Sequence, residues 1–364
     1  MTTPSAAPSS AGPSPRAEAP RAEPLRVTAV TCVKNEGPFL LEWIAYNRLI
    51  GVTDFLVFSN DCSDGTDRLL DGLAEEGVLT HLENPAQGRN YQMEALKAAR
   101  SHPLVTEADW VWVADVDEFL DIRAGEGDIA SLVAACGNPQ AISVTFRFFA
   151  NGGVERFEDR PVIGQFTRTH NPDIWNAETA IEVKTLVRQD FPLRYFGAHR
   201  PFLRKGADRP RWTDGSGREV PRRFLEAANK RRIRRFPARG ARDHATLNHY
   251  TLRSLDSYLV KCDRGDVNRD HRAFELEYWR ERNDPAVEET SILRHLPALE
   301  REMAELMERP GIRALHGQCV ALHKARRDAL LEQEEYRDLR RALLAAPTLP
   351  PAEEALLREL GVLA

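Results

Sequence analysis

Two aspartates one residue apart, followed at once by a glutamate, are the residues of this chain whose types and spacing most directly suggest chemistry. Asp115, Asp117 and Glu118 come after the apolar run 110–114. Because desolvating a carboxylate is costly, such charges belong at the end of a buried strand and not in its middle. At the carboxyl end of a strand in an open α/β sheet they would face the ligand-binding edge, where carboxylates suit Mg²⁺ or Mn²⁺ and a diphosphate. The alternative is a strand that leads into an acidic helix N-terminus.

Polar clusters also follow the two earlier apolar runs that read as strands. They are TCVKNE at 31–36 and SNDCSDGT at 59–66. Since neighbouring parallel strands end at one edge, the three clusters together suggest a nucleotide pocket, in which amides and carboxylates contact base and ribose. The alternatives are a helix cap at Asn35 and Glu36 and a plain Asx turn at 61–66. Neither cluster is a P-loop or G-x-G-x-x-G, which argues against an NTPase or dinucleotide site.

The elements that must position these clusters alternate between strands and helices. Strands are predicted at 25–33, 54–59, 78–82 and 110–114, with helices from Pro38 to about Gly51, from Thr66 to about Gly77, and over 91–99. This alternation predicts an α/β fold with a central, mostly parallel sheet flanked by helices. A further strand is expected at 141–149, with its direction left open.

Three parts of the chain differ in composition. Residues 1–24 are rich in Pro, Ala and Ser and are expected to be disordered; 25–283 are expected to form the α/β domain, and 284–364 a helical C-terminal extension. In that extension Leu356, Leu357 and Leu360 form a stripe that packs on the domain or, alternatively, makes a dimer contact.

Composition excludes several classes of protein. The net charge is −5, five scattered cysteines lack C-x-x-C spacing, and no apolar run is long enough to span a membrane. These features argue against general nucleic-acid binding, a disulfide framework and a zinc site. No secretory signal is recognised, so the expectation is a cytoplasmic protein, with contact at the inner face of a membrane left open.

Five motifs occur in a fixed order: K-N-E at 34–36, C-S-D-G-T at 62–66, W-V-x-x-A-D-V-D-E-F at 110–119, H-Y-x-x-x-S at 249–254 and K-x-x-R-G at 261–265. Together they resemble glycosyltransferase family 2, in the branch that carries D-V-D-E-F, over about residues 26 to 280. The resemblance implies a GT-A type nucleotide-diphospho-sugar transferase fold. It also implies metal-dependent, inverting transfer of a sugar from a nucleotide-diphosphate sugar, with a UDP-sugar favoured, to a hydroxyl acceptor.

The resemblance also implies roles for single residues. Asp117 would bind the metal directly, Asp115 would bind the ribose or the metal through water, and Glu118 would orient the pair or cap a following helix. Thr31 and Glu36 would contact the nucleoside, and Asn60 or Asp61 the base or ribose. The full predicted nucleotide-binding set is Thr31, Lys34, Asn35, Glu36, Asn60, Asp61, Asp64, Asp115, Lys184 and His199.

Histidine and lysine residues later in the chain have two interpretations each. His249 is a candidate third ligand for Mn²⁺ or Mg²⁺, or else a packed histidine beside Tyr250. Lys184 would neutralise a diphosphate, or else be a solvated strand lysine. His199 would contact a phosphate or the acceptor.

Inverting transfer requires a general base that deprotonates the acceptor hydroxyl. The loop 170–178 offers Asp173 and Glu178 as that base, although an ordinary surface loop is an equal alternative. The basic stretch 200–242 suggests an arm for a phosphate-bearing acceptor or an anionic membrane surface, or else a mobile solvated loop.

The predicted acceptor is a glycan, a lipid-linked glycan or a protein, in cell-surface polysaccharide synthesis. Two other functions compete with this interpretation: a nucleotidyltransferase on a related fold, and a non-catalytic module that binds sugar nucleotides.

Overall fold

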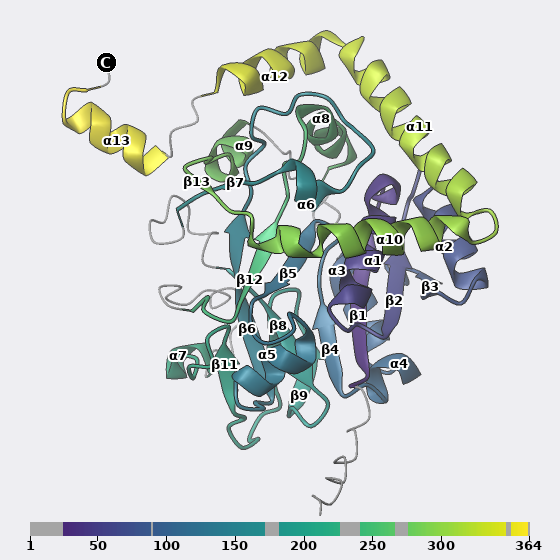
Figure 1. Ribbon diagram of the computed structural model, residues 1–364, viewed down its shortest axis with the longest axis vertical. Coiled ribbons are helices and arrows are strands. Elements are labelled where there is room, and N and C mark those ends of the chain that lie inside the picture. The colour runs from purple at the N-terminus through teal and green to yellow at the C-terminus, as the bar shows by residue number, and fades with distance from the viewer. Residues whose placement is uncertain are drawn as a thin grey trace, which may run out of the picture.

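The centre of the chain is a mixed sheet, seen in a computed structural model that describes residues 25–88, 90–171, 182–225, 241–265, 276–346 and 351–362. It has nine strands within these ranges (Figure 1). In spatial order they are β3 (Thr80–Glu83), β2 (Asp54–Ser59), β1 (Val27–Val33), β4 (Trp110–Val113), β8 (Val183–Arg188), β6 (Ala141–Phe148), β12 (Ala245–His249) and β5 (Glu118–Ile122), with β11 (Trp212–Asp214) beside β6.

Strand direction decides which residues meet at the sheet edge. Five of the eight pairings in this sheet are parallel. β8 is antiparallel to both β4 and β6, and β5 is antiparallel to β12. The starts of β8 and β5 therefore lie at the edge where β1, β2, β4, β6 and β12 end. This edge is called the upper rim below, and the predicted α/β sheet with mostly parallel pairing is confirmed.

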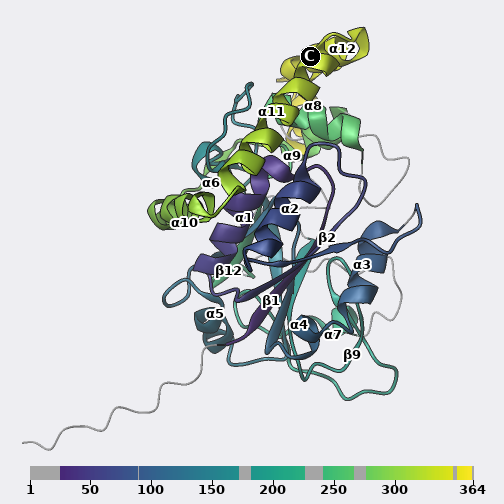
Figure 2. The ribbon, with the colours of Figure 1, turned by 90° about the vertical axis from the view of Figure 1, so that its right-hand side faces the viewer.

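Helices cover both faces of the sheet. One face carries α1 (Gly37–Leu49), α2 (Thr66–Glu75) and α5 (Ile129–Ala135), and the other carries α3 (Tyr91–Ala99) and α4 (Pro103–Thr106) (Figure 2). α1 is buried from Gly37 to Asn47 on every side, as expected for a helix that is apolar nearly all round. Its buried Glu42 accepts hydrogen bonds from the amides of Val162 (2.7 Å) and Ile163 (3.0 Å) and so holds α6 (Val162–Gln165).

Short elements complete the domain beside the sheet. They are β7 (Arg168–Thr169), β9 (Leu193–Phe196), β10 (Pro201–Leu203), α7 (Arg222–Leu225), α8 (Leu255–Arg264) and α9 (Leu276–Arg282). β9 pairs with β10 in a hairpin.

The basic stretch 200–242 is described only in part, because residues 226–240 lie outside the described part of the chain. In the described part, the guanidinium of Arg200 is buried over the rings of Trp212 (5.1 Å) and Phe224 (4.4 Å).

The last part of the chain begins with β13 (Val287–Glu288), which pairs with β7, and the short 3-10 helix η2 (Ser291–His295). Helices α10 (Leu296–Glu308), α11 (Ile312–Leu331) and α12 (Glu334–Ala345) then form three sides of a frame around α8 (Figure 1). α10 packs on α1, and α11 packs on α1, α2 and α8. The predicted extension is therefore helical after residue 290, but it shares the core of the domain.

The end of the chain departs from the sequence prediction. Helix α13 (Pro351–Glu359) is joined to α9 by an ion pair between Glu354 and Arg280, at 2.5 Å. Leu356 and Leu360 are 52% and 65% exposed. The prediction that this stripe packs on the domain is therefore wrong at these two positions, because both side chains face solvent.

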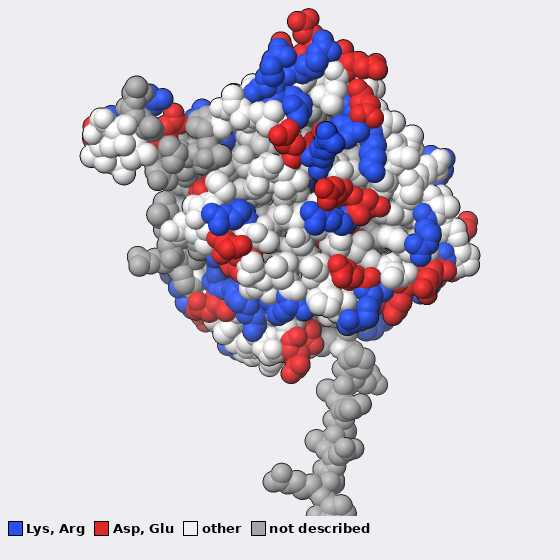
Figure 3. All heavy atoms as spheres, turned by 45° about the horizontal axis from the view of Figure 1, so that its top comes forward, with Lys and Arg blue, Asp and Glu red and all other residues white. Residues whose placement is uncertain are grey.

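Two further properties concern the surface. Basic and acidic side chains lie interspersed on the face drawn in Figure 3. Within the ranges given above, none of the helices has the length and the apolar character needed to cross a lipid bilayer.

Candidate active site

The predicted acidic cluster lies on the upper rim, in the connection between β4 and β5. Because β4 ends at Val113 and β5 begins at Glu118, residues 114–117 form a short turn between two buried strands. The alternative that Glu118 caps a helix is wrong, because the chain continues as a strand paired with β12. Asp115 is the open member of the cluster, with 40% of its side chain exposed, whereas Glu118 is buried.

Lys184 joins Asp115 to Glu118. Its ammonium lies 2.9 Å from Asp115 Oδ2 and 3.2 Å from Glu118 Oε2. Glu118 Oε2 also accepts the backbone N–H of Asp115, at 2.9 Å. Burial alone would lower the pKa of Lys184, but the two carboxylates outweigh it and raise that pKa above its usual value. The solvated alternative for Lys184 is wrong, because β8 lies inside the sheet and the side chain is 1% exposed.

Asp117 lies between a histidine and a second lysine. His249 Nε2, at the end of β12, is 3.3 Å from Asp117 Oδ1, and Lys261 Nζ, on α8, is 2.9 Å from Oδ2. Burial raises the pKa of Asp117, but Lys261 and His249 together outweigh it and hold that pKa well below its usual range. Asp117 is therefore a carboxylate near neutral pH, placed beside an imidazole.

Glu36 forms a separate buried ion cluster with two arginines. Its carboxylate contacts Arg253 Nη1 at 2.8 Å, and its other oxygen contacts Arg264. Arg264 also donates to the carbonyl of Lys34, at 2.7 Å. Burial raises the pKa of Glu36, and the two guanidinium groups lower it below its usual value. These contacts tie the loop after β1 to α8, and contact of Glu36 with a nucleoside stays a prediction.

Several polar side chains lie along the rim over β1, β2 and α3. Thr31 is buried, and within the described residues its Oγ1 has no hydrogen-bond partner. Asn60 is buried near Cys32, while Asp61 is exposed in a left-handed conformation, with φ of 47°. Gln92 Nε2 donates to Asp115 Oδ1 at 3.1 Å and so connects α3 to the acidic cluster.

Asn35 and Asp64 form the turn that joins the two loops. Asn35 Oδ1 accepts the N–H of Ser63 at 2.8 Å, and Asp64 accepts the N–H groups of Thr66 (3.0 Å) and Gly37 (3.3 Å). These hydrogen bonds match the Asx-turn alternative. Nucleotide contact by Asn35, Asp64 or Lys34 stays a prediction.

His199 lies over β8 and β6 on the same rim. Its Nδ1 is 3.2 Å from the carbonyl of Val183, and its Nε2 is 3.7 Å from Glu182. Its ring and that of His249 both lie against Phe146, with centroids 6.0 and 5.0 Å away. The two candidate histidines are therefore neighbours of one aromatic side chain. The candidate bases Asp173 and Glu178 lie outside the described residues.

The donors around Asp117 allow a test of whether a divalent ion suits this rim. Carboxylate oxygens and an imidazole nitrogen are donor types that Mn²⁺ accepts, and Asp117 and His249 already lie side by side. In the described ranges, however, no three His, Cys, Asp or Glu side chains converge on one point. Lys184 contacts Oδ2 of Asp115, and Lys261 contacts Oδ2 of Asp117. The donor types fit a divalent ion, which would share the aspartates with two ammonium groups.

Lys261 and Arg264 are two of the residues that reasoning from the sequence missed, since their motif was given no role. The i, i+3 spacing of K-x-x-R places both on one face of α8. That face lies over the rim, where Lys261 contacts Asp117 and Arg264 contacts Glu36. The available sequence signal was that Asp117 and Glu36, if buried, would each need a cation nearby.

Comparisons with known proteins give one match to a family model, which lies in the first part of the chain. Residues 28–202 match the family model described as Glycosyltransferase family 92. A family 92 protein of Ricinus communis is 29% identical over 106 residues, which are 28% of this chain and 18% of that protein. One of Arabidopsis thaliana is 34% identical over 94 residues, 24% of this chain and 15% of that protein. The aligned segments thus span less than a fifth of the length of these relatives.

Similarity to solved structures is weaker. TarS of S. aureus, residues 1–349, is 10% identical, with a TM-score of 0.32 over 85% of this chain and 92% of that one. Glucosyl-3-phosphoglycerate synthase from Mycobacterium tuberculosis, in complex with Mn²⁺, UDP and glucosyl-3-phosphoglycerate, is 15% identical, with a TM-score of 0.28 over 46% and 58% of the chains.

These findings refine the family resemblance. Membership of glycosyltransferase family 2 is not confirmed by them. The matched segment contains β1, β2, β4 and β8, and with them Asp115, Asp117 and Lys184. Residues 28–202 of this chain are therefore similar to glycosyltransferase family 92.

Proposed function

We propose that this protein is a metal-dependent glycosyltransferase that transfers a sugar from a nucleotide-diphosphate sugar, with UDP as the favoured nucleotide, to a hydroxyl acceptor. The observation that carries the proposal is the convergence of Asp115, Asp117, Lys184 and His249 on the upper rim, three of them within the segment that matches family 92. The acceptor would be a glycan, a lipid-linked glycan or a protein, in cell-surface polysaccharide synthesis.

The donor would lie along the rim from β2 to β12. Thr31, Asn60 and Asp61 would contact the base and ribose, and Asp115, Asp117 and His249 would bind a divalent ion. Mn²⁺ or Mg²⁺, when bound, would supply positive charge to the departing diphosphate. Lys184 fixes Asp115 and Glu118, and Glu118 in turn holds the backbone of Asp115. The aspartates would thus be oriented before the donor arrives.

In the proposed inverting reaction, the acceptor oxygen forms a bond to the anomeric carbon as the bond from that carbon to the diphosphate breaks. The acceptor proton passes to a carboxylate, for which Asp173 and Glu178 remain the candidates. His199 beside Glu182 would contact the acceptor or a phosphate. Contact of the basic stretch with an anionic membrane surface belongs to the same proposal.

A panel of sugar nucleotides with Mn²⁺ tests this function, with nucleotide products separated by chromatography. We expect release of a nucleoside diphosphate from one donor, and a loss of about 100-fold or more in Asp117→Asn, because a metal ligand contributes several kcal/mol to the transition state. Asp109→Asn is the matched control, since Asp109 lies at the opposite end of β4, is exposed and accepts the N–H of Arg26.

The products separate the competing functions. In a parallel assay with a nucleoside triphosphate and a sugar 1-phosphate, formation of pyrophosphate would identify a nucleotidyltransferase. Binding of a sugar nucleotide without turnover for any donor would identify a non-catalytic module.

A further inference from the structure

The ammonium of Lys261 has more hydrogen-bond acceptors than the ammonium of a lysine in a simple surface ion pair. Its ammonium lies 2.9 Å from Asp117 Oδ2, 2.9 Å from the carbonyl of Thr251 and 2.7 Å from Thr251 Oγ1. An ammonium has three hydrogen-bond donors, and each of these acceptors lies within hydrogen-bond distance of it. The lysine therefore fixes one oxygen of Asp117 at a defined position.

The same carboxylate is the one that would bind the divalent ion. Its other oxygen lies beside His249 Nε2, at 3.3 Å. An ion bound there would share Asp117 with an ammonium, and two cations on one carboxylate repel each other strongly in a partly buried site. Lys261 and a divalent ion thus compete for Asp117.

The two lysines of the rim differ in how easily a divalent ion could displace them from their carboxylates. Lys184 is 1% exposed and lies between two carboxylates, Asp115 and Glu118. Lys261 contacts the carboxylate of Asp117, is 13% exposed and lies in the last turn of α8, which ends at Arg264. Lys184 is accordingly the fixed counter-ion, and Lys261 is the one that can be displaced.

We propose that Lys261 stands in for the divalent ion at Asp117 in the free enzyme and releases that carboxylate when an ion enters together with the diphosphate of the donor. This inference rests on the proposed function. Lys261 is a positioning residue: it keeps the buried Asp117 paired and oriented before the donor binds. The charge of the diphosphate compensates the added cation, so the free enzyme binds metal weakly and the donor complex binds it tightly.

Mn²⁺ binding tests this proposal without any measurement of turnover. The free Mn²⁺ concentration is followed by electron paramagnetic resonance in titrations of the full-length protein, with and without UDP. We expect Lys261→Met to bind Mn²⁺ alone on the order of tenfold more tightly than the wild type, equivalent to about 1.4 kcal/mol. UDP should tighten Mn²⁺ binding more in the wild type than in Lys261→Met. Damage to the fold would weaken metal binding, so the expected direction is diagnostic.

Two other variants complete the experiment. Lys97→Gln removes an exposed lysine of α3, whose side chain is 77% exposed, and should leave Mn²⁺ affinity unchanged. Thr251→Val removes one acceptor of the Lys261 ammonium and should tighten Mn²⁺ binding by a smaller factor than Lys261→Met. This variant carries the test if Lys261→Met fails to fold.

Equal Mn²⁺ affinity in the wild type and the folded rim variants, with UDP still promoting binding, overturns this inference and leaves the proposed function intact. Failure of every variant to bind Mn²⁺, even with UDP, overturns the metal-dependent function as well.

Discussion

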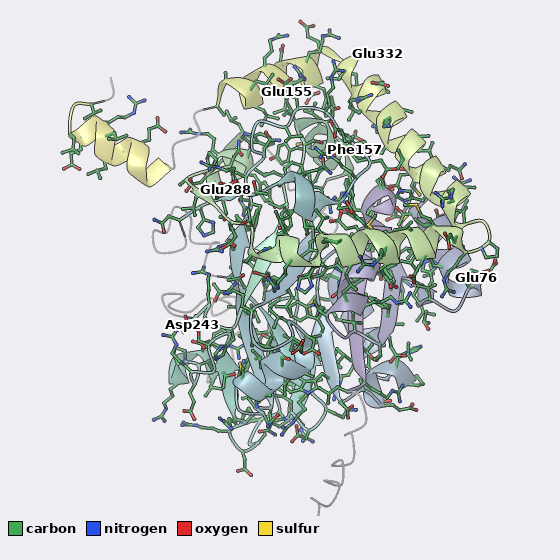
Figure 4. The ribbon with its side chains drawn as sticks, viewed as in Figure 1. Glu76, Glu155, Phe157, Asp243, Glu288 and Glu332 are labelled. Atoms are coloured by element: carbon green, nitrogen blue, oxygen red, sulfur yellow. The ribbon has the colours of Figure 1, made fainter. Side chains whose placement is uncertain are left out.

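At the scale of single residues, the buried Glu36 cluster gives a prediction about stability. Glu36→Gln leaves Arg253 and Arg264 buried without their carboxylate, and removing one partner of a buried ion pair costs about 3–5 kcal/mol. We expect this loss in the free energy of unfolding, measured with urea at pH 7. Glu155→Gln is the control, because the Glu155–Arg340 pair is exposed and its loss should cost less than about 1 kcal/mol; Figure 4 labels Glu155.

The pH dependence of the same variant follows from the direction of the pKa shift. The pKa of Glu36 is lowered in the folded protein from its usual 4.5. The stability that this carboxylate adds is therefore complete above 4.5 and is lost as the pH falls toward the folded pKa. The difference in the free energy of unfolding between wild type and Glu36→Gln should therefore shrink as the pH falls from 7 to 4. A difference that grows on acidification would contradict the ion cluster.

Sequence reasoning located the rim residues better than their partners. Asp115, Asp117 and His249 were predicted together, and the structure places His249 Nε2 3.3 Å from Asp117 Oδ1. The partners Lys261 and Arg253 come from a helix and a loop more than 130 residues later in the chain. Nothing local in the sequence sets such distances, because they depend on how α8 packs over the sheet.

At the scale of elements, the strands and helices that local pattern determines were predicted closely. β2 and α3 have the predicted limits, because each is an apolar or amphipathic run with clear boundaries. β5 was missed, because its sequence EFLDI carries two acids in a fully buried strand. The charge of Asp121 in this strand is compensated by two arginines. Arg123 lies just beyond the end of the strand, and Arg294 lies on η2, in a distant part of the chain.

The contact between α1 and α11 gives the next prediction. A Cβ atom on Gly37 would lie 2.5 Å from Cys319 Sγ and 2.7 Å from Cys319 Cβ, so Gly37→Ala should force α11 outward and cost about 1–3 kcal/mol. Gly317→Ala is the matched control on α11. Its Cβ meets no atom within 4 Å, so the substitution should stabilise the helix by up to about 1 kcal/mol.

Urea unfolding of the two alanine variants measures both effects. The test is the sign of the change in the free energy of unfolding for each variant. Helix propensity alone would stabilise both variants or neither. If Gly37→Ala is as stable as the wild type, α11 does not approach the start of α1 as closely as the structure indicates.

At the scale of the whole molecule, the C-terminal helices are part of the domain and not an appendage. Leu299, Leu306, Ile312 and Cys319 belong to the same buried cluster as α1. The sequence predicted amphipathic helices in this region, but a stripe of apolar residues does not identify the surface that it covers. The predicted boundary at residue 283 therefore divides one hydrophobic core.

Truncation tests this conclusion. A chain that ends at residue 295 loses those four side chains from the core, and each large buried apolar side chain contributes about 1.5–3 kcal/mol. The sum is comparable with the whole stability of a typical domain, about 5–15 kcal/mol. We therefore expect the shortened chain to be insoluble or to lack a cooperative thermal transition by circular dichroism. A chain that ends at residue 346 loses α13 and the ion pair between Glu354 and Arg280, and the leucines lost with them at 356 and 360 are exposed. Its melting temperature should change by no more than about 2 °C. A cooperative transition in the chain that ends at 295 would show that the domain folds without α10 and α11, contrary to the shared core.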